Sequence, residues 1–251
     1  MLDQIRGDLR IQPRVSVVIA VTAIALTALM YFEPKLTSVY GVNNSNGVSF
    51  WTRTSVPFIH GYDTSAITGF ALLGINIFLF YLLGTFIEKI LGGLRFLILC
   101  SVTFLVYILL HRAMLMIGHG LTPLIMAFSS FSLILLLECR FVKTSSSYDD
   151  YFKTMWIVNI FVWLATPVLM SIIPIYFDSH TTGINAVITG NILIVAGWIT
   201  GLIMGFIFRG HLRKNLVHYA RKKYIKHSKI DNSAWTFALL IPIYLLLLFF
   251  I

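Results

Sequence analysis

Charged residues are scarce in this chain, and acidic residues are the scarcest of them: 10 Asp and Glu stand beside 19 Lys and Arg in 251 residues. A soluble domain carries roughly 25% charged residues, whereas this chain carries 12% charged and 58% hydrophobic residues. Its mean hydropathy is +0.85. This composition excludes a soluble globular domain and predicts an all-α, polytopic helical membrane protein.

Apolar stretches that can cross a bilayer, at about 1.5 Å of rise per residue, recur along the whole chain. They fall near 15–33, 66–88, 94–117, 120–139, 154–177, 184–208 and 234–251, which predicts seven spans. We therefore expect an N-terminal tail (1–14), a six-helix membrane domain (15–208, with a loop at about 34–65), a basic loop (209–233) and a C-terminal transmembrane helix (234–251).

Basic residues are distributed unevenly among the predicted loops. With the N-terminus inside, every Lys and Arg falls on the cytoplasmic side except Lys35, Arg53 and Arg112. Basic residues in short loops stay in the cytoplasm, so the sequence predicts a cytoplasmic N-terminus and an external or lumenal C-terminus. It leaves open whether the membrane is a bacterial inner membrane or the endoplasmic reticulum.

Cysteine is nearly absent as well. Cys100 and Cys139 fall near the cytoplasmic ends of their spans, where thiols are reduced. His and Cys residues form no cluster with metal-ligand spacing, so we expect no metal ion and no cofactor. The net charge of +9 gathers in the loop after the sixth span, which favours membrane lipids over nucleic acid as partners.

That basic loop has apolar residues at roughly helical spacing: Leu212, Leu216, Tyr219, Ala220 and Tyr224. The pattern indicates an amphipathic helix on the cytoplasmic leaflet. The residues expected to contact lipid headgroups are Arg213, Lys214, Arg221, Lys222 and Lys223. A solvated connector that enforces the topology explains the same charges equally well, and a docking surface for a cytosolic partner is a third interpretation.

Gly197, Gly201 and Gly205 recur at every fourth position of the sixth span. Glycines at this spacing leave one side of a helix without side chains, so that another membrane helix can approach its backbone closely. We expect this row to be a site of tight helix packing.

Thr122 has the hydroxyl best placed for nucleophilic chemistry, at the external mouth of the fourth span. Hydrolysis of a peptide bond also needs a base within hydrogen-bond reach. The external histidines lie in or near loops, where a lone His is more often solvated or hydrogen-bonded than a base; they are His60, His111, His119 and His180. A simpler account makes Thr122 an N-cap and Pro123 the first helical residue.

Several motifs follow one another in a definite order. The segment Phe50–Gly61 contains Trp51 and Arg53 and ends in Phe58-Ile59-His60-Gly61. The second span carries Asn76, Gly84, Glu88 and Gly92, followed by Leu94-Arg95-Phe96. The motif Gly120-Leu121-Thr122-Pro123 comes next, and the glycine row of the sixth span comes last. This ordered set, over spans two to six, resembles the rhomboid intramembrane proteases. The resemblance implies a rhomboid-like six-helix bundle, to which the final span would be an addition.

The catalytic positions depart from the rhomboid pattern. Thr122 stands where the family has its nucleophilic Ser and Pro123 where it has Gly; Ile194 stands where it has the base His, and Leu72 where it has a further His. Asn76 and Asn191 keep their family places. A hydroxyl without a base is a poor nucleophile, so we expect no ordinary rhomboid proteolysis.

The resemblance then implies a pseudoprotease that binds transmembrane clients or serves as a subunit of a membrane protein complex. Residues expected at the client or gate region are Trp51, Arg53, His60, His119, Pro167 and Pro174. The two prolines equally fit a kinked packing helix. A divergent protease that uses Thr122, with His119 or another external histidine as base, is one alternative. A transporter or channel is another, although the internal repeats typical of transporters are not visible.

Overall fold

The computed structural model describes residues 14–33, 52–60, 66–114, 120–139, 160, 184–220 and 229–247. Within these ranges the secondary structure is helical, with no strand. The elements are α2 (Val15–Phe32), the short 3₁₀ helix η2 (Thr52–Phe58), α4 (Ala66–Leu91), α5 (Gly93–Met114), α6 (Thr122–Cys139), α8 (Ile184–Ile207), α9 (Arg209–Ala220), α10 (Lys229–Ala238) and α11 (Leu240–Leu247). The predicted span at 154–177 and most of the loop at 34–65 lie outside the described residues.

The described residues are all-helical, and the length and apolar character of several helices suit a polytopic membrane protein. Three segments of the described residues are long and apolar enough to cross a bilayer: Val15–Phe32, Gly69–Leu91 and Gly93–Leu110. A fourth is obtained if Ile192–Ile207 and Arg209–His218 are taken as one span, but the two are bent by 67°. The segment Thr122–Glu138 in α6 is apolar but shorter.

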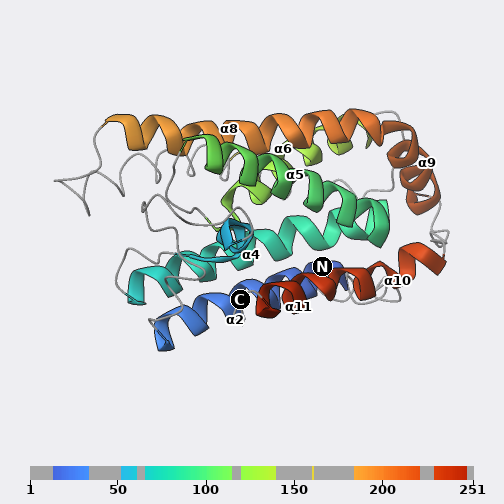
Figure 1. Cartoon of the computed structure of the whole chain (residues 1–251). Helices are drawn as coiled ribbons and strands as arrows, with labels where there is room; N and C mark the ends of the chain where they lie inside the picture. Colours follow the sequence, from blue (N-terminus) through green and yellow to red (C-terminus); the bar gives the residue numbers. More distant parts are fainter. Residues whose placement is uncertain are drawn as a thin grey trace.

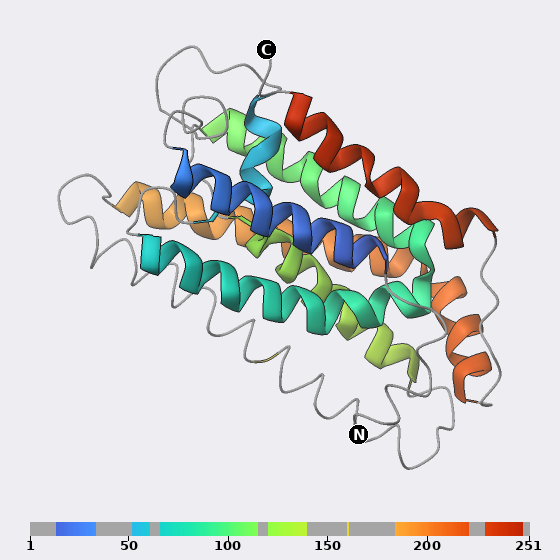
Figure 2. The same ribbon diagram turned by 90° about the horizontal axis from the view of Figure 1, so that it is seen from below.

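Close packing joins the helices into one bundle. Figure 1 shows α8 with α6 on one side and α2 with α10 and α11 on the other, with α4 and α5 between them. Seen from below, α10 runs beside α5 and α2 (Figure 2). The largest fully buried side chains are phenylalanines, and three of them come from α4, α5 and α6. The rings of Phe80 and Phe96 each lie against that of Phe128 in a tilted arrangement.

A tight turn at Gly92 connects α4 to α5. Gly92 has a φ of 86°, a conformation that side chains disfavour but glycine adopts freely. Its N–H donates to the Glu88 carbonyl at 2.8 Å, and its carbonyl accepts from the Phe96 N–H at 3.0 Å. One helix therefore ends and the next begins within a single residue, as in the C-terminal caps of other helices.

The C-terminal part differs from the single span predicted at 234–251. Helix α10 begins at Lys229, the chain turns at Leu239, and α11 starts at Leu240. Pro242 accounts for the break, because its ring has no N–H to donate to the preceding turn. The Ile243 N–H reaches the Leu239 carbonyl at 3.4 Å, which is a long hydrogen bond.

Candidate functional site

Thr122 is the first residue of α6, and the helix begins one residue earlier than the capping interpretation requires. The Leu121 carbonyl accepts the N–H groups of Leu124 and Ile125, both at 3.0 Å, so Leu121 takes the N-cap position. The prediction of Thr122 as N-cap was therefore wrong by one residue. Its hydroxyl is left to interact with another helix.

That hydroxyl points toward α4. Thr122 is buried, and its Oγ1 donates to the Asn76 Oδ1 at 3.5 Å. This distance lies at the long limit for a hydrogen bond between oxygens, so the contact is weak. These two residues, which are far apart in the chain, are nevertheless neighbours in space.

His60 lies beside the same turn. It is 2% exposed, and its Nε2 accepts the Leu121 N–H at 3.2 Å. Gly120 has a φ of 56°, and a Cβ at this position would overlap the His60 ring. His60 and Gly120 together therefore fix the turn that leads into Thr122.

The electrostatic state of His60 follows from this burial. Burial lowers its pKa from 6.5 to about 4, and the Phe58 carbonyl opposes the shift only in part. Because Nε2 accepts a hydrogen bond, the neutral ring carries its proton on Nδ1. The lone pair that a general base would need is already engaged.

The remaining candidate catalytic and gate residues named from the sequence are apolar or have side chains outside the described set. Ile194 is 3% exposed and belongs to the apolar core, so no base stands there. Leu72 is half-buried on α4. Asn191 lies on α8 and Arg53 in η2, but their side chains are outside the described set, as are the residues Trp51, His119, Pro167 and Pro174.

The glycine row on α8 lies directly against α6. A Cβ at Gly197 would overlap the Pro123 carbonyl, and one at Gly201 would overlap the Ala127 carbonyl and the Ser130 hydroxyl. At Gly205 a Cβ would lie 2.8 Å from Ile134 Cγ1. The backbones approach so closely at two of these turns that no side chain fits, which is the small-residue packing seen between membrane helices.

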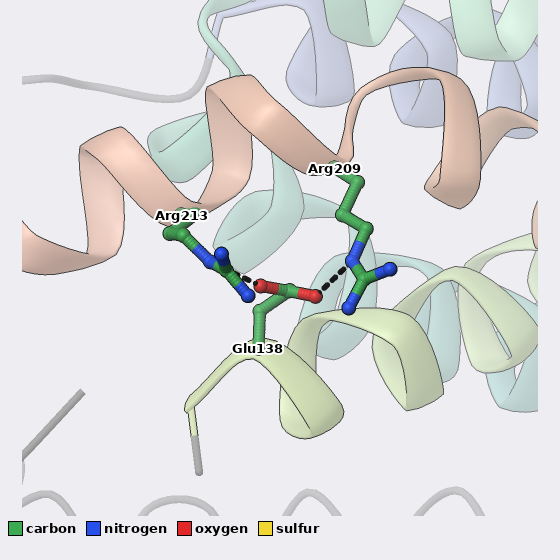
Figure 3. A network of polar contacts seen from close by, with 3 residues as sticks. All are labelled: Glu138, Arg209 and Arg213. Carbon is green, nitrogen blue, oxygen red and sulfur yellow. Dashed lines mark hydrogen bonds and ion pairs between the residues drawn. The ribbon is translucent and has the colours of Figure 1, made fainter. Parts of the chain in front are cut away.

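A charged cluster lies at the opposite end of α6 from Thr122. The Glu138 carboxylate is held between two arginines of α9 (Figure 3): it accepts from Arg209 Nε, and from Arg213 Nε at 2.8 Å. Lys214 is exposed on the same helix. The predicted headgroup residues Arg221, Lys222 and Lys223 lie outside the described residues.

A second buried carboxylate lies where α4 meets the start of α2. Glu88 accepts the N–H groups of Arg14, Val15 and Ser16 at 2.9–3.0 Å, and the Ser16 hydroxyl at 2.5 Å. The first N–H groups of a helix have no partners within it and favour an anion. Glu88 thus caps α2 from another helix.

Sequence reasoning missed these tertiary roles. Glu88 was noted only as a match to the rhomboid pattern, and no local signal links it to residues 14–16. Arg209 and Arg213 are four residues apart, a spacing that places both on one side of a helix. This spacing is visible in the sequence, but only the fold identifies the carboxylate that the two arginines share. No group of three or more His, Cys, Asp or Glu side chains that could hold a metal ion occurs among the described residues.

Comparisons with protein-family models, with curated proteins and with solved structures found no match to this chain.

Proposed function

We propose that this chain is a non-catalytic membrane protein with a rhomboid-like helix arrangement, which binds transmembrane segments of other proteins or serves as a subunit of a membrane complex. In this proposal residues 15–208 form the six-helix bundle, the helices after residue 229 are an addition to it, and the N-terminus is cytoplasmic. The resemblance in sequence motivates the helix arrangement. The hydrogen bonding around Thr122 supports the absence of catalysis.

The observation that carries the proposal is the state of His60. It is the described histidine that lies beside the Thr122 turn, yet its Nε2 accepts the Leu121 N–H. A base must accept a proton from the nucleophile through a free lone pair within about 3 Å. The Nε2 lone pair of His60 is not free, and Ile194 supplies no base. Thr122 Oγ1 instead interacts with the amide oxygen of Asn76.

A cleavage assay combined with purification of complexes tests this proposal. The full-length protein is purified from its native membrane in mild detergent, and proteins that remain bound at a fixed ratio are identified. These proteins are then incubated with the wild type and with the Thr122→Ala and Thr122→Ser variants. We expect a stoichiometric partner that stays intact with all three forms.

Cleavage by the wild type and the Ser variant, but not by the Ala variant, would contradict the proposal and establish a divergent protease. In that case His60→Gln identifies the base: loss of cleavage would assign it to His60, and retained cleavage would assign it to another external histidine. A chain that purifies alone and cleaves nothing would contradict the binding function itself.

A further inference from the structure

Arg14 and Trp235 meet where α2 begins, next to α10. Helix α10 runs beside α2 (Figure 1), and the Arg14 Cζ lies over the Trp235 ring, 5.4 Å from its centre. A guanidinium within about 6 Å of an indole face is attracted by the electrons of the ring. Trp235 itself is half-buried and packs against the apolar core. The ring therefore restricts where the Arg14 side chain can lie.

Stacking leaves the N–H donors of Arg14 available. It occupies the flat face of the guanidinium, whereas the N–H groups point outward in the plane of the group. Arg14 is exposed, and Glu88 contacts it through the backbone N–H only, at 3.0 Å. Among the described residues no carboxylate pairs with the Arg14 guanidinium. Its charge and its donors are thus presented at the surface of the bundle.

Helix α10 is held in this position by contacts with α5. Asp231, one helical turn before Trp235, pairs with Arg95 at 3.6 Å. The two backbones approach so closely that a Cβ on Gly93 would overlap the Asp231 carbonyl. Trp235 is therefore placed by contacts that do not involve Arg14.

Both residues lie at the level where a membrane-spanning helix ends. Arg14 directly precedes Val15–Phe32, which is long and apolar enough to cross a bilayer. Tryptophan is enriched at the headgroup level of membranes, and an arginine at a helix end extends its charge to the same level. The pair is therefore at the depth of lipid phosphates.

A row of exposed apolar side chains continues from Arg14 along α2. Val17, Val21 and Ile24 follow it at helical spacing and are 45%, 58% and 44% exposed. At about 1.5 Å of rise per residue the row extends roughly 15 Å from Arg14, which is half of the hydrocarbon thickness of a bilayer. An acyl chain that starts at the headgroup level of one leaflet spans the same distance.

We propose that Arg14, held by Trp235, binds the phosphate of an anionic phospholipid whose acyl chain lies along Val17, Val21 and Ile24. The planar donors of an arginine bind phosphate oxygens in a defined geometry, unlike the point charge of a lysine. Trp235 is a positioning residue that keeps the guanidinium at the head of the apolar row. The basic residues predict that this end of the bundle is cytoplasmic, where the leaflet is rich in acidic lipids. The inference does not depend on whether the protein binds transmembrane clients.

Titration of the full-length protein with single lipids tests the inference. The protein is held in neutral detergent, and native mass spectrometry gives the Kd of the first bound molecule of phosphatidylglycerol, or of phosphatidylcholine with the same chains. Arg14→Gln removes the guanidinium but keeps the backbone N–H that donates to Glu88. We expect it to raise the Kd for phosphatidylglycerol about fivefold, the factor that corresponds to about 1 kcal/mol per basic residue. The Kd for phosphatidylcholine should change by less than about twofold.

Two further variants separate the site from diffuse charge. Lys214→Gln is the matched control, because it removes one exposed basic residue from another helix, and the Kd for phosphatidylglycerol should stay within about twofold of the wild type. Trp235→Leu keeps the charge of Arg14 but removes the ring, and should raise this Kd at least about twofold. Combined with Arg14→Gln it should add nothing, since the ring acts through Arg14. If Trp235→Leu is not recovered folded, Arg14→Lys takes its place and should also raise the Kd at least about twofold.

An unchanged Kd in Arg14→Gln would overturn the inference. An equal rise in Lys214→Gln would also overturn it, because binding would then depend on diffuse charge. So would a rise of the same size for both lipids, since a damaged fold would explain it. Additive effects of Arg14→Gln and Trp235→Leu would contradict the positioning role of Trp235. Inorganic phosphate at millimolar concentration is expected not to displace the lipid, and displacement would assign the site to a free anion.

Discussion

His60 must stay neutral in the folded chain, because protonation of Nε2 would set two donors against each other at the Leu121 N–H. Its pKa is about 4 in the folded state and 6.5 without the fold. Between these values the unfolded chain binds a proton that the folded chain does not. The stability is therefore full above pH 6.5 and is lost progressively as the pH falls toward 4, by roughly 3 kcal/mol in all.

Thermal unfolding in detergent between pH 7.5 and 4 measures this loss. Other groups titrate in the same pH range, so the melting temperature of the wild type is compared with that of His60→Gln at each pH. Glutamine retains an acceptor for the Leu121 N–H but does not titrate. We expect the melting temperature of the variant to fall less steeply as the pH is lowered. If the melting temperatures of the two proteins fell in parallel, His60 would be excluded as the source of the pH-dependent loss of stability.

At the scale of single elements, Glu88 ties the first described helix to α4. A carboxylate from α4 accepts three backbone N–H groups and a hydroxyl at the start of α2, whose own first turn has no acidic residue. Glu88→Gln places an amide N–H₂ against these donors and is expected to destabilise the protein by about 3 kcal/mol. Ser16→Ala removes one of the four contacts and should cost about 1 kcal/mol. The free energy of unfolding in mixed micelles is measured for both variants and the wild type. Equal stability of Glu88→Gln and the wild type would contradict the capping role of Glu88.

The contact between α6 and α8 depends on glycine at Gly201. Even a methyl group there would overlap the backbone of α6, so Gly201→Ala is expected to destabilise the protein by about 1–3 kcal/mol through overpacking, and Gly201→Leu by more. Gly74 offers a matched control, because it is also helical but has nothing within 4 Å of an added Cβ.

Gly74→Ala should be neutral or stabilising by up to about 1 kcal/mol, since alanine favours a helix. The melting temperatures of the two alanine variants in detergent check the comparison. A Gly201→Ala protein as stable as Gly74→Ala would show that α8 can move away from α6 without cost.

Over the whole molecule, the features that could be predicted from the sequence are those that depend on residues close together in the chain. Apolar length alone predicted helices near 15–33, 66–88 and 94–117, and the spans found among the described residues confirm these three. The spacing of Gly197, Gly201 and Gly205 predicted a close helix contact but not that α6 would supply it. Pro242 is visible in the sequence, yet apolar length outweighed it and the break at Leu239 was missed.

The candidate site was less predictable because its contacts join residues that are far apart in the chain. That Thr122 meets Asn76, and that His60 accepts the Leu121 N–H, are contacts between residues 46 and 61 positions apart. No local pattern encodes them. The rhomboid resemblance singled out the residues, whereas their hydrogen bonding depends on how η2, α4 and α6 come together.

The orientation of the bundle in its membrane is a property of the whole molecule, and the arrangement of its ends makes it testable. One end of the bundle, where α4 and α6 finish and α5 begins, carries Glu88, Arg95, Glu138 and Arg209. The excess of basic residues predicts that this end is cytoplasmic. In a Cys139→Ser background, Cys100 is buried and should not react. We expect a membrane-impermeant maleimide to label Glu33→Cys, at the exposed end of α2, on intact cells, and to label Lys214→Cys on α9 only after the membrane is opened. The reverse pattern would invert the topology and would place α9 on the external side of the membrane.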